Sequence, residues 1–183
     1  MLVIHPKDKT TTVLSLLYEG MEVRLLDQTS NSAEIKRTLN HTPKQERIML
    51  LGHGMDKGLL TRDNEEQEVF HRLMVYHPHA YYLRKHEGNI VAVWCNADLF
   101  ARKEGLHGLF TGMIISELSE ALIYEVETTQ EELLDRETPK LVKRLRLLLD
   151  EDIPLHEIPD RILAMDDVHS PLTEFNYRHF YYL

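Results

Sequence analysis

Two residues with reactive side chains each follow a short apolar run. His53 follows residues 48–52, Ile-Met-Leu-Leu-Gly, and Cys95, the only cysteine in the chain, follows residues 90–94, Ile-Val-Ala-Val-Trp. Continuous apolar runs of this length are typical of parallel strands that helices cover on both faces. Ligands of such sheets bind beyond the carboxyl ends of the strands. If these two strands are neighbours, the imidazole and the thiol face one crevice.

An imidazole beside a thiol predicts nucleophilic catalysis. The thiolate is the reactive form of cysteine, and a nearby histidine or helix amino terminus favours it by lowering the thiol pKa. Residues 97–103 are predicted to form a helix that begins next to Cys95. Gly54 lets a backbone NH approach a substrate closely, so we predict that the NH groups of Gly54 and Cys95 stabilise an oxyanion.

The periodicity of the chain predicts the elements that position these residues. Apolar or alternating runs predict strands, amphipathic spacing predicts helices, and the polar residues 54–68 predict an exposed loop or hairpin beside the crevice. Their order predicts an α/β fold, a three-layer sandwich with a central, mostly parallel sheet of five to six strands. The predicted strands are residues 1–5, 21–26, 48–52, 90–94 and 111–116, and the predicted helices are residues 13–18, 33–42, 69–87, 97–103 and 117–127.

The last third of the chain is predicted to be helical. Thr129 with Glu132 has the pattern of a capping box and predicts the start of a helix, and Thr138 before Pro139 predicts that a second helix begins there. A third helix is expected around residues 159–165.

The whole chain is predicted to be a single domain, residues 1–183. Residues 1–127 form its sheet region, and residues 128–183 form a helical extension with an aromatic tail. The tail residues Phe175, Tyr177, Phe180, Tyr181 and Tyr182 need a surface to pack on, either in their own domain or in a second copy, which would make a homo-oligomer.

Composition excludes several classes of partner. The chain has 183 residues and a formal net charge of -9, which disfavours binding to nucleic acid or to an anionic membrane. No apolar run approaches the ~20 residues of a membrane span. One cysteine cannot form an intrachain disulfide, and the first residues lack the pattern of a signal peptide, so we expect a cytoplasmic protein.

The two motifs resemble the signature of a known family, the caspase-like cysteine peptidases, whose clan also includes legumains, gingipains, clostripain and separase. That signature is an apolar strand ending in His-Gly, followed one crossover later by an apolar strand ending in the catalytic cysteine. The resemblance covers about residues 1–124. It implies a caspase-like sandwich, His53 as general base and acid, Cys95 as nucleophile, Gly54 in the oxyanion hole, a peptide or protein substrate, and no cofactor or metal.

The resemblance also implies a substrate pocket. In the family, the strand after the cysteine strand helps to line it, and by position Ser116 and Glu117 fall there. A carboxylate from Glu117 or Glu120 would favour cleavage after basic residues. Asp27 and His5, at predicted strand ends, are the candidates to orient His53.

Two alternatives remain. Trp94 is bulkier than the residue that the family usually has before the cysteine, so a non-catalytic binding or regulatory domain of the same fold is one of them. Gly52-His53-Gly54 also resembles the oxyanion loop of α/β-hydrolases, and Asp166 and His169 follow in the required order for an esterase with a cysteine nucleophile. The branched Val93 would crowd the nucleophile elbow of that fold, which requires small residues, and we rank it lower.

Overall fold

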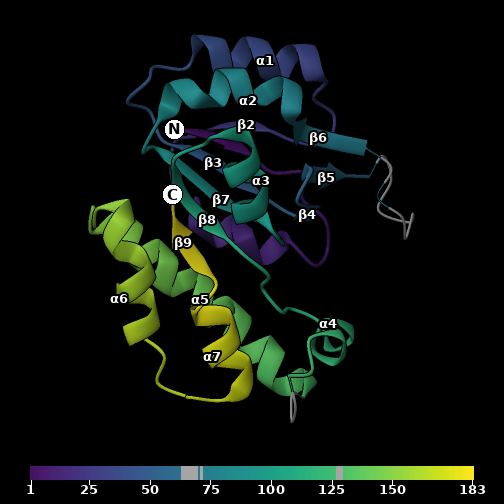
Figure 1. Cartoon of the computed structure of the whole chain (residues 1–183), viewed down its shortest axis with the longest axis vertical. Coiled ribbons are helices and arrows are strands. Elements are labelled where there is room, and N and C mark those ends of the chain that lie inside the picture. The colour runs from purple at the N-terminus through teal and green to yellow at the C-terminus, as the bar shows by residue number, and fades with distance from the viewer. Residues whose placement is uncertain (63–69, 71, 127–129) are drawn as a thin grey trace.

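A central sheet of six strands, in the order β2-β1-β3-β7-β8-β9, organises the described part of the chain. The structure is a computed structural model and describes residues 1–62, 70, 72–126 and 130–183 (Figure 1). The first five strands in this order are parallel and the sixth is antiparallel to β8, so the predicted α/β class with a mostly parallel sheet is confirmed. The strands are β1 (Leu2–Ile4), β2 (Arg24–Leu26), β3 (Ile48–Leu51), β7 (Ile90–Val93), β8 (Gly108–Thr111) and β9 (Phe180–Tyr182).

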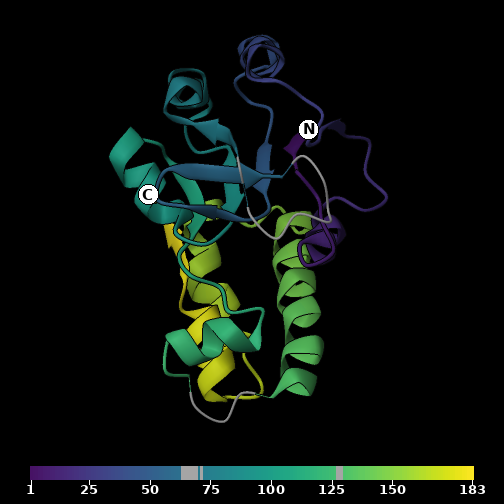
Figure 2. The same ribbon diagram turned by 90° about the vertical axis from the view of Figure 1, so that its right-hand side faces the viewer.

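Alternating side chains of these strands build two apolar cores, one on each face of the sheet. Leu50 and Ala92 point into the first core, and Met49 and Val91 point into the second. The first core is covered by α1 (Ser32–His41), α2 (His77–Leu83) and α3 (Ala97–Glu104) (Figures 1 and 2). The second is covered by the 3-10 helix η1 (Thr12–Leu17), α5 (Glu131–Asp150), α6 (Ile158–Ala164) and α7 (Pro171–Tyr177), which completes the three-layer sandwich.

A small antiparallel sheet follows His53. It contains β4 (Gly54–Met55), β5 (Gly58–Thr61) and β6 (Arg72–Tyr76), in agreement with the hairpin expected within residues 54–68, of which 63–68 lie outside the described residues. The helix predicted over residues 69–87 is wrong in its first part, because residues 72–76 pair with β5. Pro78 lies in the first turn of α2, where proline is favoured, and therefore starts that helix.

Helix α5 is continuous where two helices were predicted. Pro139 lies inside it, and Thr138 is an interior residue instead of an N-cap. Proline in a helix interior costs about 3 kcal/mol. The opposing effect is larger, because each fully buried aliphatic side chain contributes about 1.5–3 kcal/mol. The buried stripe on both sides of the proline consists of Leu134, Leu141, Val142, Leu145, Leu148 and Leu149.

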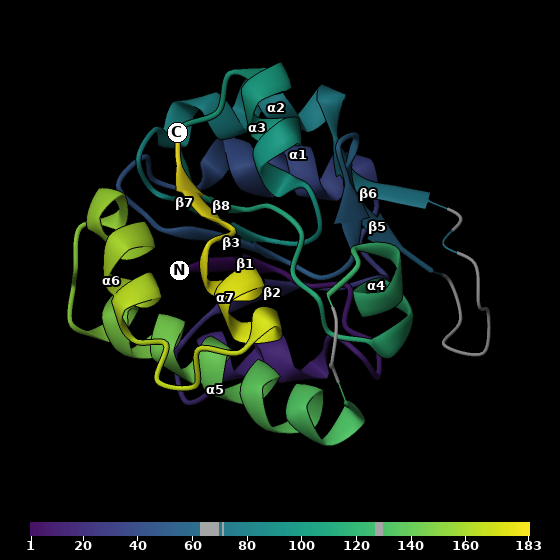
Figure 3. The same cartoon turned by 60° about the horizontal axis from the view of Figure 1, so that its bottom comes forward.

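A strand was predicted at residues 111–116, but the strand in this region, β8, covers Gly108–Thr111 and ends where the predicted one begins. Ile115 is fully buried but has no strand partner in the described sheets, because the amide of Asn176 binds its backbone instead. The apolar run therefore continues beyond the strand as a buried loop, which leads to the short helix α4 (Leu118–Ile123). Figures 1 and 3 place α4 on the same side of the molecule as the small sheet.

The aromatic tail packs on its own domain. β9 pairs with β8, and Phe180 and Tyr177 are buried in the second core. Residues 130–183 supply the sixth strand of the sheet and most of one helical layer, so the sheet is not complete before them. Two short 3-10 helices, η2 (Arg84–His86) and η3 (Leu155–Glu157), complete the described elements. No helix of these residues is long and apolar enough to cross a bilayer.

Candidate functional site

The two reactive residues follow adjacent strands at the same level of the sheet. β3 pairs directly with β7, which meets the condition set for the shared crevice, and the last matched pair is Leu51 with Val93. His53 and Cys95 each come two residues after that pair, and the Gly52 NH donates to the Val93 carbonyl at 3.1 Å. Both side chains line one cavity of about 70 Å³ beyond the carboxyl ends of the strands. The order of the sheet reverses between β1 and β3, the position at which ligands of open α/β sheets bind.

His53 is held by the loop that follows β1. Its Nε2 lies 2.6 Å from the Thr10 hydroxyl and 3.4 Å from Oδ2 of Asp8. Its ring also packs against Phe70, with 4.8 Å between the ring centroids. The imidazole is therefore fixed on one side by polar contacts and on one face by an aromatic ring.

These contacts determine which ring nitrogen carries the proton. The Thr10 hydroxyl has one hydrogen, which it donates to Asp8 Oδ1 at 3.0 Å, so its oxygen must accept from His53. An ionised carboxylate can likewise only accept a hydrogen bond. Nε2 of His53 is therefore the protonated nitrogen in the neutral ring, and Nδ1 is the nitrogen that can accept a proton.

Asp8 is the carboxylate that pairs with His53, and it was not among the residues predicted from the sequence. It is buried, with 4% of its surface exposed, and accepts from the Arg62 guanidinium at 2.5 Å and from the Thr11 NH at 2.9 Å. Burial alone would raise the pKa of this carboxyl. The hydrogen bonds from His53, Thr11 and Arg62 outweigh burial and hold the pKa well below its usual range, so Asp8 is ionised.

The two predicted orienting residues have other partners. Asp27 accepts from the NH and the hydroxyl of Thr29, at 2.9 and 2.6 Å, in a local turn. His5 lies 3.1 Å from the hydroxyl of Tyr18. Asp27 and His5 follow β2 and β1 as expected, but His53 pairs with Asp8 instead, because the loop after β1 turns back across the end of β3.

Cys95 lies in surroundings that keep its thiol neutral. Burial raises the pKa of the Cys95 thiol to about 11, and the negative charges of Glu120 and Glu117 contribute in the same direction. The sulfur donates a weak hydrogen bond to the Ile114 carbonyl, 3.9 Å away. None of the hydrogen bonds of the described residues joins Cys95 to His53. The helix α3 begins at Ala97, two residues after Cys95, as predicted.

Gly54 has a clear packing role. A Cβ atom at this position would lie 2.1 Å from Cδ1 of Trp94, so only glycine allows the indole to pack here. Trp94 is 2% exposed, and its Nε1 donates to the Met55 carbonyl at 3.2 Å. The indole therefore joins the strand of Cys95 to the small sheet that follows His53. The oxyanion role of the Gly54 and Cys95 NH groups stays a prediction.

The predicted pocket residues lie at the cavity or next to it. Ser116 and Glu120 line the cavity, and Glu117 lines a groove that continues from it. One Glu120 oxygen accepts from the NH groups of Ser116 and Glu117, at 2.8 and 3.1 Å. The Glu120 carboxylate therefore caps the start of α4, whether or not it also contacts a ligand.

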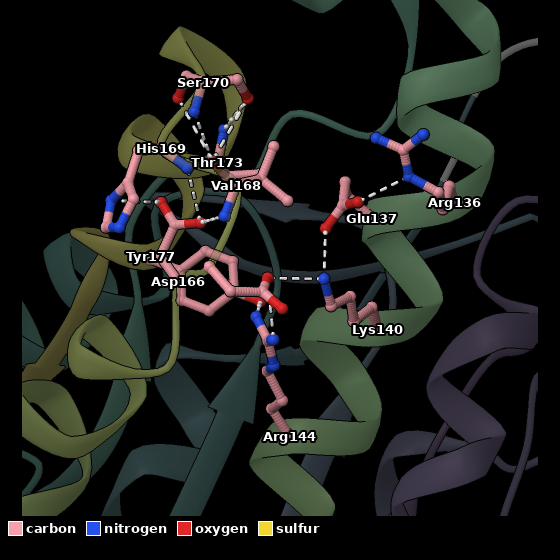
Figure 4. A network of polar contacts seen from close by, with 11 residues as sticks. Arg136, Glu137, Lys140, Arg144, Asp166, Val168, His169, Ser170, Thr173 and Tyr177 are labelled. Carbon is pink, nitrogen blue, oxygen red and sulfur yellow. Dashed lines mark hydrogen bonds and ion pairs between the residues drawn. The ribbon is translucent and has the colours of Figure 1, made fainter.

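The residues suggested for a hydrolase triad lie elsewhere. Asp166 and His169 occupy the segment between α6 and α7, where Asp166 accepts from the NH groups of Val168 and His169 (Figure 4). Neither residue lines the Cys95 cavity. Next to them, Asp167 binds Lys140 at 2.5 Å and Arg144 at 2.9 Å, which anchors this segment to α5. The contacts of Asp166 and His169 do not support the esterase alternative.

Comparisons with models of protein families, with curated proteins and with solved structures found no significant match to this chain.

Proposed function

We propose that the chain is a cysteine peptidase of the caspase-like type, with Cys95 as the nucleophile and His53 as the general base and acid. The observation that carries the proposal is the position of these residues two places beyond a matched pair of adjacent parallel strands, facing one cavity. The Asp8 and Thr10 contacts support it further, because they leave Nδ1 of His53 free of a proton. A cytoplasmic peptide or protein is the proposed substrate.

The first half of the reaction forms an acyl-enzyme. The Cys95 sulfur attacks the scissile carbonyl carbon while its proton passes to Nδ1 of His53, and the carbonyl π electrons move to the oxygen. The NH groups of Gly54 and Cys95 donate to this oxyanion. When the carbonyl reforms, the C–N bond breaks and the amine leaves with the proton from His53. Because the resting thiol is neutral, His53 must accept its proton during the attack.

The second half releases the acid and restores the thiol. His53 takes a proton from a water molecule as the water oxygen attacks the thioester carbon. The C–S bond then breaks, the carboxylic acid leaves, and His53 returns its proton to the sulfur. Asp8 stabilises the imidazolium in both halves, because it is ionised and buried beside Nε2.

The test is cleavage of a diverse peptide mixture, read by mass spectrometry, with the wild-type chain and four variants. We expect C95A and H53A to abolish cleavage, and D8N to reduce kcat by about 10²–10⁴-fold, since D8N removes the charge that stabilises the imidazolium. T10S keeps the hydroxyl and should retain activity. Cleavage that persists in C95A would refute the assignment of the nucleophile.

A binding or regulatory domain of the same fold is the second candidate. The observation in its favour is that the Cys95 thiol is neutral and donates a hydrogen bond to the Ile114 carbonyl, so it is not activated as a nucleophile. This candidate predicts that the wild-type chain cleaves no peptide in the mixture and that wild type and C95A retain the same peptides on an affinity column. Cleavage by wild type that is lost in C95A would exclude it.

A further inference from the structure

The cavity beside Cys95 has an apolar floor and a polar rim. The buried apolar lining residues form its floor, between the sheet and the helices of the second core, and the half-buried Ser116, Thr138 and Glu120 form its rim. The residues of the floor are Leu14, Leu17, Leu141, Val142, Leu145 and Phe180.

We propose that this cavity takes the side chain of the residue that supplies the scissile carbonyl, and that this side chain is a mid-sized aliphatic group such as that of leucine, valine or methionine. The proposal rests on the proposed peptidase function. It replaces the preference for basic residues expected from Glu117 and Glu120 with a preference for apolar ones.

The floor argues against a basic side chain. A lysine or arginine that reached into the cavity would place its charge among leucine, valine and phenylalanine side chains, and burying a charge without a partner is strongly unfavourable. Glu120 lies at the rim, and its carboxylate already accepts hydrogen bonds from two backbone NH groups and from the Ser116 hydroxyl. Glu117 lies farther out and is exposed. An aliphatic side chain instead gains about 25 cal/mol for each Å² of apolar surface that leaves water.

The volume of the cavity limits the size of the group. It is about 70 Å³, which is roughly half of the ~150 Å³ engineered apolar cavity that binds benzene. A branched aliphatic group fits such a space with little rearrangement. A phenyl or indole ring would require the surrounding helices to move apart.

The rim supplies contacts for a peptide backbone. Thr138 Oγ1 is buried and has no hydrogen-bond partner among the described residues, so a ligand NH or carbonyl at the rim would satisfy it. A groove lined by Thr10, Ser116, Thr138 and Asp135 continues from the rim to the surface. An extended peptide can therefore run along the groove while one side chain enters the cavity.

The first test compares fluorogenic peptides that differ only at the residue before the scissile bond, which is Leu, Val, Phe, Lys or Asp. We expect kcat/KM for the Leu peptide to exceed that for the Lys peptide by about 100-fold and that for the Phe peptide by about 10-fold, the scale of discrimination in apolar pockets. A Lys peptide cleaved as fast as the Leu peptide would overturn the inference and leave the peptidase function standing.

The second test changes the size of the cavity. Val142 and Leu147 lie on the same helix, but Val142 is 6% exposed and lines the cavity, whereas Leu147 is 48% exposed. V142F should reduce cleavage of the Leu peptide at least tenfold, and V142A should raise the ratio of Phe to Leu cleavage. L147F is the matched control and should leave both values unchanged. Equal Phe-to-Leu ratios in wild type and V142A would contradict the proposed location of the pocket.

A binding measurement tests the aliphatic pocket without requiring catalysis. C95A is used with the same peptides, labelled for fluorescence anisotropy, so that no turnover is needed. We expect the Leu peptide to bind at least tenfold more tightly than the Lys peptide, and V142F to remove that difference. Equal binding of the two peptides would refute the aliphatic pocket, whereas absence of cleavage by wild type with selective binding of Leu would refute only the peptidase function.

Discussion

At the scale of single residues, the neutral state of the Cys95 thiol predicts that it reacts slowly with alkylating reagents near neutral pH. Its pKa is about 11, compared with about 8.5 for free cysteine. Only the thiolate is alkylated, so the second-order rate with iodoacetamide should rise about tenfold for each pH unit from pH 7 to pH 10. The rate should level off only near pH 11. The measurement is stopped-time alkylation followed by intact-mass spectrometry.

Glutathione under identical conditions is the control, and its rate should level off near its own, lower thiol pKa. E120Q removes one of the charges that disfavour the thiolate, and it should therefore increase the rate at pH 8. A plateau for Cys95 below pH 8 would mean that the thiol is already activated in the resting chain.

The proposed catalytic pair could be predicted from the sequence, but the residues that hold His53 in place could not. His53 and Cys95 could be found because each ends a continuous apolar run, and such runs predict buried neighbouring strands. Asp8 lies in a polar loop, and its pairing with His53 depends on how that loop turns over the end of β3. The turn has a local signal, since Asp8 accepts from the NH and hydroxyl of Thr11, but that signal does not indicate which strand end it approaches.

At the scale of elements, Pro139 is the least favourable residue of α5. Its ring removes the NH that would bond to the carbonyl of Asp135. P139A restores this hydrogen bond, so we expect the free energy of unfolding to rise by about 1–3 kcal/mol, as measured by urea denaturation. K143A, at an exposed position of the same helix, should change it by less than about 0.5 kcal/mol. A decrease in stability for P139A would mean that the proline ring makes a packing contact of its own.

The errors in the predicted elements have one physical cause. Hydrophobic periodicity and proline positions indicate the local preference for a helix or a strand. In α5, in β6 and in the segment after β8, burial in the folded chain determined the conformation instead. Six buried aliphatic residues keep α5 helical through Pro139. The run of Ile114 and Ile115 has strand composition, yet a side-chain amide, that of Asn176, takes the place of a neighbouring strand. No local pattern could identify a partner so distant in sequence.

At the scale of the whole molecule, β9 contributes both to the stability of the fold and to the lining of the proposed pocket. β9 closes the sheet from the far end of the chain, and Phe180 on it reaches both the second core and the cavity beside Cys95. β9 is therefore part of the proposed pocket. Phe180 and Tyr182 lie on the same strand, but Phe180 is 5% exposed and Tyr182 is 42% exposed, so they form a matched pair for a test.

F180A should lower the free energy of unfolding by about 3 kcal/mol or more, because the lost side chain adds empty volume to a cavity that is already present. Y182A should lower it by no more than about 1 kcal/mol. Urea denaturation followed by circular dichroism measures both. F180A that remains folded should also accept the Phe peptide better relative to the Leu peptide, since the pocket is larger. Equal destabilisation by the two variants, with no change in peptide preference, would contradict the roles assigned to Phe180 in stability and in substrate preference.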